Sequence, residues 1–294
     1  MDMLARIETA LDATIAAHEI PGAPPKLSAA IRHAVFPGGA RIRPQLCLAV
    51  SHACGNDDPA LAQAAAIALE LIHCASLVHD DLPCFDDAAT RRGRPSVQAA
   101  YGEPLAVLAG DALIVLAFQA LADGAGHAPA RLPTVLGTVA RGTGMPFGIV
   151  AGQSWECEPR VALSDYQRAK TGALFAAATA AGAQAAGVDG QVWRALGERL
   201  GEAYQVADDI RDVLSDPSVL GKPIGQDAAL GRPSAAHELG LGGAIRHFES
   251  LVAGAIDAIP RCAGAPRLRA LVRMESERLV PKAWYEDVAR RVTA

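Results

Sequence analysis

One long stretch, Ala60–His79, limits the possible folds of this chain more than any other. Its apolar residues, among them Ile67, Leu71 and Val78 between many alanines, recur on nearly all sides of a helix. A helix that is apolar all round is buried in the middle of a bundle. The stretch therefore predicts a protein in which several helices surround a central one.

Helix-period patterns recur along the rest of the chain, whereas alternating strand patterns are scarce. Met3–Ala17, for example, has apolar residues at steps of three and four. No linker divides the chain, so residues 1–294 are expected to form one all-α domain, a bundle of about ten or more helices. The remaining long helices are expected at 104–123, 131–142, 164–187, 189–214, 241–259 and 266–280.

Composition excludes several classes of protein. A net charge of −5 argues against a nucleic-acid partner, and no run is apolar enough to predict a membrane span. The start of the chain, with Asp2, Arg6 and Glu8, does not resemble a secretory signal. The six cysteines show no C-x-x-C spacing, which favours small core residues in a reduced, cytoplasmic protein over a zinc site or a disulfide scaffold.

Two acid clusters interrupt these apolar helical runs. The first is Asp80-Asp81-Leu82-Pro83-Cys84-Phe85-Asp86-Asp87, and the second is Asp208-Asp209-Ile210-Arg211-Asp212. Burying several charges of one sign near apolar surface is costly unless something positive neutralises them. Hard cations that prefer oxygen ligands, such as Mg²⁺, are the natural candidates.

The second cluster has the spacing of a single helix face. Gln205, Asp208 and Asp212 lie at i, i+3 and i+7. A solvated acidic face is the alternative, but apolar neighbours such as Val206 and Ile210 favour a metal site on a partly buried helix. In the first cluster Pro83 is expected to end or kink the helix.

Short basic motifs accompany the acids. Mg²⁺ commonly uses one or two carboxylates together with water and substrate phosphates, so two facing clusters would hold a polyphosphate between them. Arginine and lysine side chains could bind that group directly. Singly, each basic motif is more typical of a solvated surface; the candidates are Gly38–Pro44, Arg91-Arg92-Gly93, Lys170-Thr171-Gly172 and Gly221-Lys222.

On these motifs the chain resembles the isoprenyl (polyprenyl) diphosphate synthases. The resemblance runs from about Phe36 to Ser234 and is greatest to bacterial geranylgeranyl diphosphate synthases of carotenoid and bacteriochlorophyll pathways. It implies an all-α bundle around a central cavity. It also implies head-to-tail condensation of isopentenyl diphosphate with dimethylallyl, geranyl or farnesyl diphosphate. Further motifs that carry it are Ala109–Leu113, Gly152-Gln153 and Tyr204-Gln205-x-x-Asp208-Asp209-x-x-Asp212.

The resemblance also implies roles for individual residues. Four carboxylates would hold about three Mg²⁺ ions on the allylic diphosphate: Asp80, Asp86, Asp208 and Asp212. Arg91, Lys170 and Lys222 would bind the same diphosphate, while Arg43, His73 and Arg92 would bind isopentenyl diphosphate. Thr171 and Gln205 would direct oxygen dipoles at the carbocation, and Asp81 belongs to the first catalytic motif. For His73 a buried structural role is the alternative, and the segment 213–235 is expected to close over the site.

In the family, positions four, five and eight before the first aspartate form the floor of the product tunnel. Here these are Ser76, Ala75 and Ile72. Alanine in place of an aromatic residue at 75 implies a product longer than fifteen carbons, most simply the twenty-carbon one, with Phe118 a candidate for a deeper stop. The alternatives are that the chain is a farnesyl diphosphate synthase, a terpene cyclase or a non-catalytic partner subunit. A homodimer is expected from the resemblance.

The sequence departs from the family pattern at a few positions. Ala40 replaces a lysine that contacts isopentenyl diphosphate, Ala88 and Ala89 replace further acids of the first motif, and Glu156 replaces the aspartate that usually follows Gly-Gln. These departures are interpreted as variation within the closer subgroup.

Overall fold

The computed structural model describes residues 2–36, 38–55, 58–126, 128–159, 162–214, 234–281 and 284. These residues form an almost entirely helical protein, and the resemblance and the helical periodicity predicted this fold class correctly. The α-helices are α1 (Met3–Ala16), α2 (Pro25–Val35), α3 (Ile42–Ala53), α4 (Pro59–Asp80), α5 (Val97–Tyr101), α6 (Glu103–Asp123), α7 (Leu132–Thr143), α8 (Ile149–Ser154), α9 (Leu163–Gln167), α10 (Ala173–Ala185), α11 (Arg194–Leu214), α14 (Ala235–Asp257) and α15 (Ala265–Leu279).

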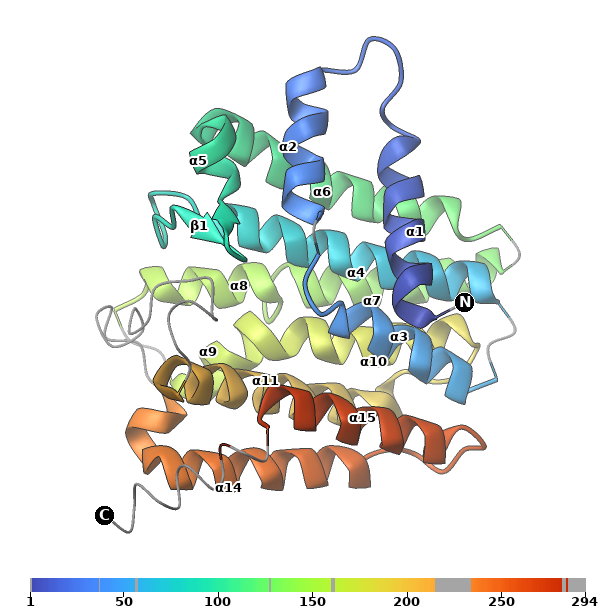
Figure 1. Ribbon diagram of the computed structural model, residues 1–294. Coiled ribbons are helices and arrows are strands. Elements are labelled where there is room, and N and C mark those ends of the chain that lie inside the picture. Colours follow the sequence, from blue (N-terminus) through green and yellow to red (C-terminus); the bar gives the residue numbers. More distant parts are fainter. Residues whose placement is uncertain are drawn as a thin grey trace.

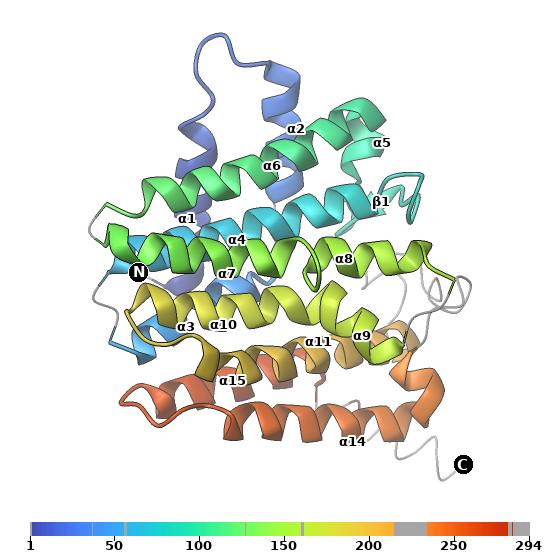
Figure 2. The same cartoon turned by 180° about the vertical axis from the view of Figure 1, so that it is seen from behind.

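Helices α4 and α10 lie in the middle of the bundle (Figures 1 and 2). Both are buried over most of their length, which confirms the central helix predicted from Ala60–His79. Asp58 begins α4 by accepting a hydrogen bond from the Leu61 amide at 3.2 Å, and Pro59 occupies the first helical position. Burial of apolar side chains is the dominant favourable contribution to folding, and most residues of α4 are buried.

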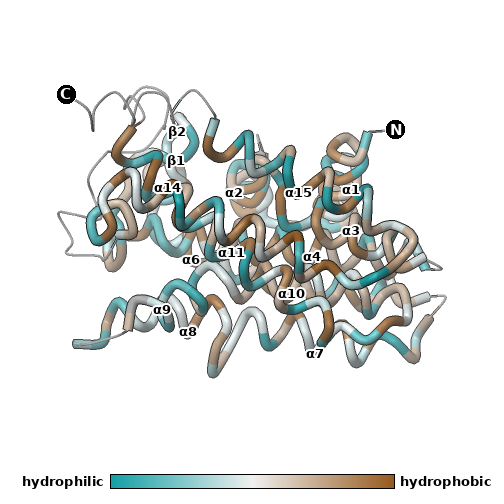
Figure 3. The backbone as a smooth tube through the Cα atoms, turned by 90° about the horizontal axis from the view of Figure 1, so that it is seen from below, coloured by the Kyte–Doolittle hydropathy of each residue, from teal (hydrophilic) through white to brown (hydrophobic). Residues whose placement is uncertain are grey.

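The other helices surround this centre. Helices α1 and α2 cross the long axis of α4 on one side (Figure 1). Hydrophobic and hydrophilic residues alternate along α11, α14 and α15, as Figure 3 shows. This alternation is expected for outer helices that bury only one face.

Some short elements were not predicted. No helix was predicted where α2, α3, α5 and α8 lie, and α2 begins at Pro25. Helix α14 begins six residues before the predicted start at 241, because its first turns precede a break at Gly240, where φ is +66°. Helices α5 and α8 have only five and six residues and bury few apolar side chains, so their periodic signal is weak.

A small hairpin follows the first acid cluster. Its strands β1 (Thr90–Arg91) and β2 (Arg94–Pro95) pair antiparallel. The two residues between them, Arg92 and Gly93, both have positive φ, at +54° and +73°, as a type I′ turn requires. No hairpin was predicted here, because strand patterns are scarce in the sequence and arginine is an uncommon residue in that turn.

Two helices, α4 and α6, are long and apolar enough to cross a membrane by length and composition alone. The sequence analysis had not expected any such segment. In α4 the most apolar stretch is 78% buried, as is typical of the central helix of a bundle. In α6 the corresponding value is 44%, so one apolar face of α6 lies at the surface.

Candidate active site

A cavity of about 650 Å³ lies where α4 and α11 end. Both acid clusters contribute to its wall, through Asp80, Asp86, Asp208 and Asp212. The structure therefore brings together two pairs of carboxylates from clusters that are far apart in the sequence.

The first acid cluster folds back on itself. Helix α4 ends at Asp80, before Pro83, as predicted, and the amide of Asp86 donates a hydrogen bond to the carbonyl of Asp80 at 3.0 Å. Burial raises the pKa of the Asp80 carboxyl, Lys170 opposes this, and Asp86 adds to it. The buried Asp80 Oδ1 has no hydrogen-bond partner. A carboxylate oxygen in this state suits a cation.

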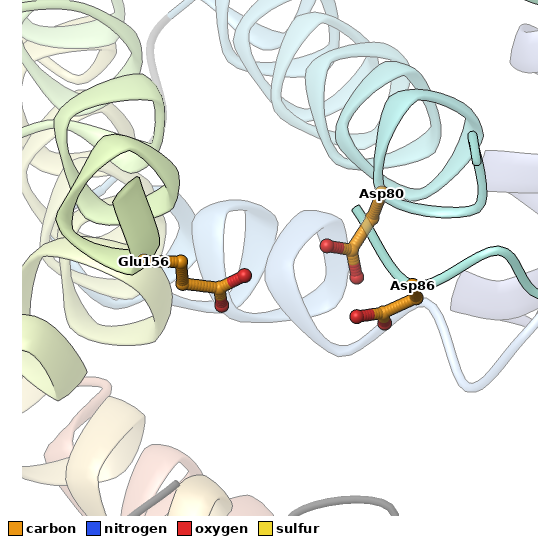
Figure 4. A group of neighbouring side chains, drawn as sticks. All are labelled: Asp80, Asp86 and Glu156. Atoms are coloured by element: carbon orange, nitrogen blue, oxygen red, sulfur yellow. The ribbon is translucent and has the colours of Figure 1, made fainter. Parts of the chain in front are cut away.

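A third carboxylate joins Asp80 and Asp86. Glu156, in the turn Trp155–Cys157 after α8, points toward both of them across the cavity (Figure 4). One oxygen from each of the three lies within 4.8 Å of the others, which is close enough for one cation to contact all three. Hard oxygen donors in this number fit Mg²⁺. Sequence analysis had noted Glu156 only as a departure from the family pattern, although its spacing from Gly152-Gln153 was the signal.

The aspartates of the second acid cluster lie on two sides of α11. Asp208, Asp212 and Gln205 all line the cavity, as the helical spacing predicted. Asp209 faces away and is 2% exposed. Its Oδ2 accepts a hydrogen bond from the Ala235 amide at 2.7 Å and so caps the start of α14.

Thr171 and Gln205 are held by a chain of hydrogen bonds. The Thr171 hydroxyl donates to Gln205 Oε1 at 2.9 Å, and Gln205 Nε2 donates to Asp209 at 3.1 Å. Both Thr171 and Gln205 line the cavity. Asp209, itself held by the Ala235 amide, therefore accepts from Gln205 Nε2 and so fixes the orientation of the Gln205 amide.

Asp81 and Arg91 form a pair beside the cavity. Asp81 is 2% exposed, and Arg91 Nε donates to Asp81 Oδ1 at 2.9 Å. Burial raises the pKa of Asp81, while the hydrogen bond from Arg91 opposes that rise. Of the described residues that line the cavity, Arg91 is one and Asp81 is not. The structure thus places Asp81 behind Arg91, where it orients the guanidinium.

A cationic region of the same cavity lies between α3 and α4, where Arg43 and His73 line the wall. The buried guanidinium of Arg43 stacks over the Phe175 ring at 4.6 Å, and Arg43 Nε and His73 Nδ1 are buried with no hydrogen-bond partner. Burial is the main reason that the pKa of His73 lies well below its usual value, and the positive charges of Arg43 and Arg92 lower it further. The imidazole is therefore neutral at neutral pH. Arg92 lies over Gly39, where an added Cβ would come within 2.8 Å of the guanidinium. The unpartnered N–H donor of the Arg43 guanidinium fits an anion.

Arg41 holds the segment that carries Arg43. Its side chain is fully buried and donates to Glu70 at 2.6 Å, to Glu8 at 2.8 Å and to the Val35 carbonyl at 2.7 Å. Its φ of +49° is uncommon for a residue other than glycine. In the sequence Arg41 stands out only as part of the motif Gly38–Pro44, because its two acidic partners, Glu8 and Glu70, are far from it along the chain.

The remaining predicted site residues do not all lie on the cavity wall. Ser76 lines the cavity, whereas Ala75 is 1% exposed in the hydrophobic core and is not among the described lining residues. Phe118 is partly buried against the same core. Lys222 and most of the segment 213–235 lie outside the described residues.

Comparisons with known proteins assign the chain to one family of enzymes. The family model described as polyprenyl synthetase matches residues 24–243. The chain is 56% identical to geranylgeranyl diphosphate synthase of Cereibacter sphaeroides, covering 98% of both chains. It is 48% identical to the enzyme of the same name from Rhodobacter capsulatus, covering 95% of this chain and 97% of that one.

A solved structure is similar over nearly the whole chain. It is a geranyltransferase from Helicobacter pylori complexed with magnesium and isoprenyl diphosphate, with a TM-score of 0.78 and 26% identity. The alignment covers 94% of this chain and 97% of that one.

Proposed function

The chain belongs to the polyprenyl synthetase family, and from that premise we propose that it condenses isopentenyl diphosphate head to tail with allylic diphosphates to give geranylgeranyl diphosphate. It is a prenyltransferase. The observation that carries the proposal is that one cavity has the carboxylates of both acid clusters on one part of its wall and Arg43 with His73 on another. Two anionic substrates can bind side by side in such a site.

Asp80, Asp86, Asp208 and Asp212 would hold Mg²⁺ on the allylic diphosphate, and the buried Asp80 Oδ1, which accepts no hydrogen bond although Lys170 Nζ lies 3.5 Å away, supports this assignment. When bound, the ions would neutralise the charge of the leaving diphosphate. About three ions are expected from the resemblance. The magnesium in the Helicobacter pylori structure supports the choice of metal.

The side chains around the cavity have distinct tasks in the reaction. Lys170 and Arg91 bind the allylic diphosphate, whose C–O bond breaks to leave an allylic cation. The oxygens of Thr171 and Gln205, fixed by their hydrogen bonds, stabilise that cation. The double bond of isopentenyl diphosphate, held by Arg43 and its neighbours His73 and Arg92, attacks the cation. The departing diphosphate accepts the proton that is then lost.

The cationic region also separates the alternatives. A terpene cyclase binds one diphosphate and needs no second region such as that around Arg43 and His73. A non-catalytic partner subunit would not need both acid clusters on the cavity wall. Farnesyl diphosphate as the final product is less consistent with the geranylgeranyl diphosphate synthases that share 56% and 48% of their residues with this chain.

Purified protein, Mg²⁺ and each allylic diphosphate, incubated with and without labelled isopentenyl diphosphate, test the proposal. We expect elongation to a twenty-carbon diphosphate only when isopentenyl diphosphate is present. A cyclic hydrocarbon formed without it would identify a cyclase, and inactivity under all conditions would point to a partner subunit.

The length of the product is expected to depend on Ser76 and Ala75. Ser76 lies on the cavity wall, so Ser76→Phe should block the tail and shift the main product from twenty to fifteen carbons. Ala75→Tyr should shorten the product as well, and should also cost about 1–3 kcal/mol of stability because Ala75 is tightly packed. Product chromatography checks both, with Ser76→Ala as the control. Unchanged products in both large-residue variants would remove these residues from the tunnel.

We further propose that a second copy of the chain covers the exposed face of α6. Leu108 and Val115 are 52% and 57% exposed on that helix, and the length and apolarity of α6 are otherwise those of a buried helix. Replacing both with glutamate should convert a dimer to a monomer in size-exclusion chromatography with light scattering. Val192→Glu, at a residue that is 54% exposed elsewhere, is the control and should leave the dimer intact. A wild-type monomer would contradict the proposal.

We also place the protein in the cytoplasm, in line with its six free cysteines, of which Cys47 and Cys74 are buried. Burial raises the pKa of both thiols to about 12, so they are unreactive core residues. A role in carotenoid synthesis follows from the resemblance alone.

A further inference from the structure

We propose that Glu156 is a positioning residue, which holds the ammonium group of Lys170 at the edge of the first acid cluster. This inference rests on the proposed function, in which Lys170 binds the allylic diphosphate. Glu156 itself reaches the substrate only through Lys170.

The backbone brings these two residues together. Lys170 lies in a single π-helical turn, Arg168–Gly172, between α9 and α10. Gly152 of α8 lies so close to this turn that an added Cβ would come within 2.2 Å of the backbone nitrogen of Lys170. Because any side chain at 152 would push the two segments apart, glycine there allows the turn after α8 to place Glu156 beside Lys170. Single π-helical turns of this kind are common at functional sites.

The carboxylate of Glu156 is held by several donors. Its Oε1 accepts hydrogen bonds from the Tyr166 hydroxyl at 2.6 Å and from Lys170 Nζ, and its Oε2 accepts one from Gln153 at 3.1 Å. Tyr166 and Gln153 therefore fix the glutamate, and the glutamate fixes the end of a long and otherwise mobile lysine side chain.

The position of Lys170 suits a diphosphate. Its Nζ lies 3.5 Å from Asp80 Oδ1, so the ammonium group stands between Glu156 and the acid cluster. An ammonium group has three N–H donors. Glu156 and Asp80 thus hold the ammonium group at the cavity that Lys170 lines, where an oxygen of the bound diphosphate would accept a hydrogen bond from it.

An alternative is that Glu156 binds Mg²⁺ directly, since its carboxylate lies within 4.8 Å of those of Asp80 and Asp86. The donors already bound to both of its oxygens favour the positioning role. The two roles differ in a way that can be measured: a positioning residue acts only while Lys170 is present, whereas a metal ligand acts without it.

A double-mutant cycle with Glu156→Gln and Lys170→Met separates the two roles. Calorimetry with the unreactive thiolo analogue of geranyl diphosphate, in the presence of Mg²⁺, measures affinity without turnover. We expect Glu156→Gln to weaken binding about tenfold in the wild-type background and by less than about twofold when Lys170 is methionine. Glu156→Asp should recover most of the affinity, and the KM for isopentenyl diphosphate should not change.

The control is Asp165→Asn, which removes a nearby exposed ion pair with Arg168 at 2.5 Å and should leave analogue binding unchanged. Equal losses from Glu156→Gln in both backgrounds, or loss of a bound ion when Mn²⁺ is counted by electron paramagnetic resonance, would overturn the positioning role. Because the cycle measures binding, it is informative even if the elongation assay fails, and that assay alone judges the proposed function.

Discussion

Asp80→Asn is expected to lower kcat by about 10²–10³-fold while leaving the protein as stable as the wild type or slightly more so. The asparagine has the same shape but no charge, so the site would lose one metal-binding oxygen. Metal stabilisation of a leaving group is worth several kcal/mol, and each 1.36 kcal/mol changes the rate about tenfold. Steady-state kinetics at saturating Mg²⁺ measure the loss.

The expected stability follows from the pKa of Asp80. Burial raises that pKa, which means that the folded protein disfavours the ionised carboxylate when no cation is bound. Above the unfolded pKa the charge therefore costs stability, and the neutral amide removes that cost. Thermal melting without Mg²⁺ measures this effect.

A matched control lies in the same cluster. Asp87 is exposed and has a φ of +46°, which asparagine also tolerates, and it is not among the described residues that line the cavity. Asp87→Asn should keep nearly full activity. Similar losses of kcat in the two variants would show that the net charge of the cluster matters, and would contradict a specific role for Asp80.

Arg41→Met is expected to cost about 3–5 kcal/mol of unfolding free energy. The substitution would leave Glu70, whose side chain is 2% exposed, as an uncompensated buried charge. A loss of this size is a large part of the roughly 5–15 kcal/mol that stabilises an ordinary domain. It should also raise the KM for isopentenyl diphosphate, since Arg41 holds the segment that presents Arg43. Urea unfolding and substrate titration measure the two effects.

Two further variants test the reason for this cost. The double variant Arg41→Met, Glu70→Leu removes both buried charges and should recover much of the stability. Arg32→Met removes a guanidinium that pairs with Asp12 and Glu19 on the surface, at 2.7 Å from each, and should cost less than about 1 kcal/mol. Equal losses from Arg32→Met and Arg41→Met would mean that burial of the ion pair is not what makes Arg41 important.

The parts of the fold that the sequence predicted well are those with local and repeated signals. The apolar surface of Ala60–His79 predicted the central helix α4, and Pro83 predicted its end near Asp80. The spacing of Gln205, Asp208 and Asp212 predicted one face of α11, and all three do line the cavity. Each of these inferences needed only helix geometry.

The parts that were missed depend on contacts between distant segments. Nothing within the first acid motif indicates that Asp81 pairs with Arg91, because the pairing needs the loop between them to fold back, with the Ala88 amide donating to the Asp81 carbonyl at 3.1 Å. Likewise the burial of Arg41 depends on Glu70, which comes from another helix. Glu156 joins Asp80 and Asp86 as a third carboxylate because α8 packs against the π-helical turn, a contact that the sequence does not predict. Such pairings follow from tertiary packing, which periodicity does not encode.

The capping role of Asp209 has a consequence for how such motifs are interpreted in evolution. Asp208 and Asp209 are neighbours in the sequence, yet one faces the cavity and the other holds the amide of Ala235. Selection can therefore retain the second of two adjacent aspartates for the sake of folding, independently of any metal. A homologue that kept Asp209 but lost Asp208 would keep the local architecture without the chemistry, and counting acids in the motif would not reveal the difference.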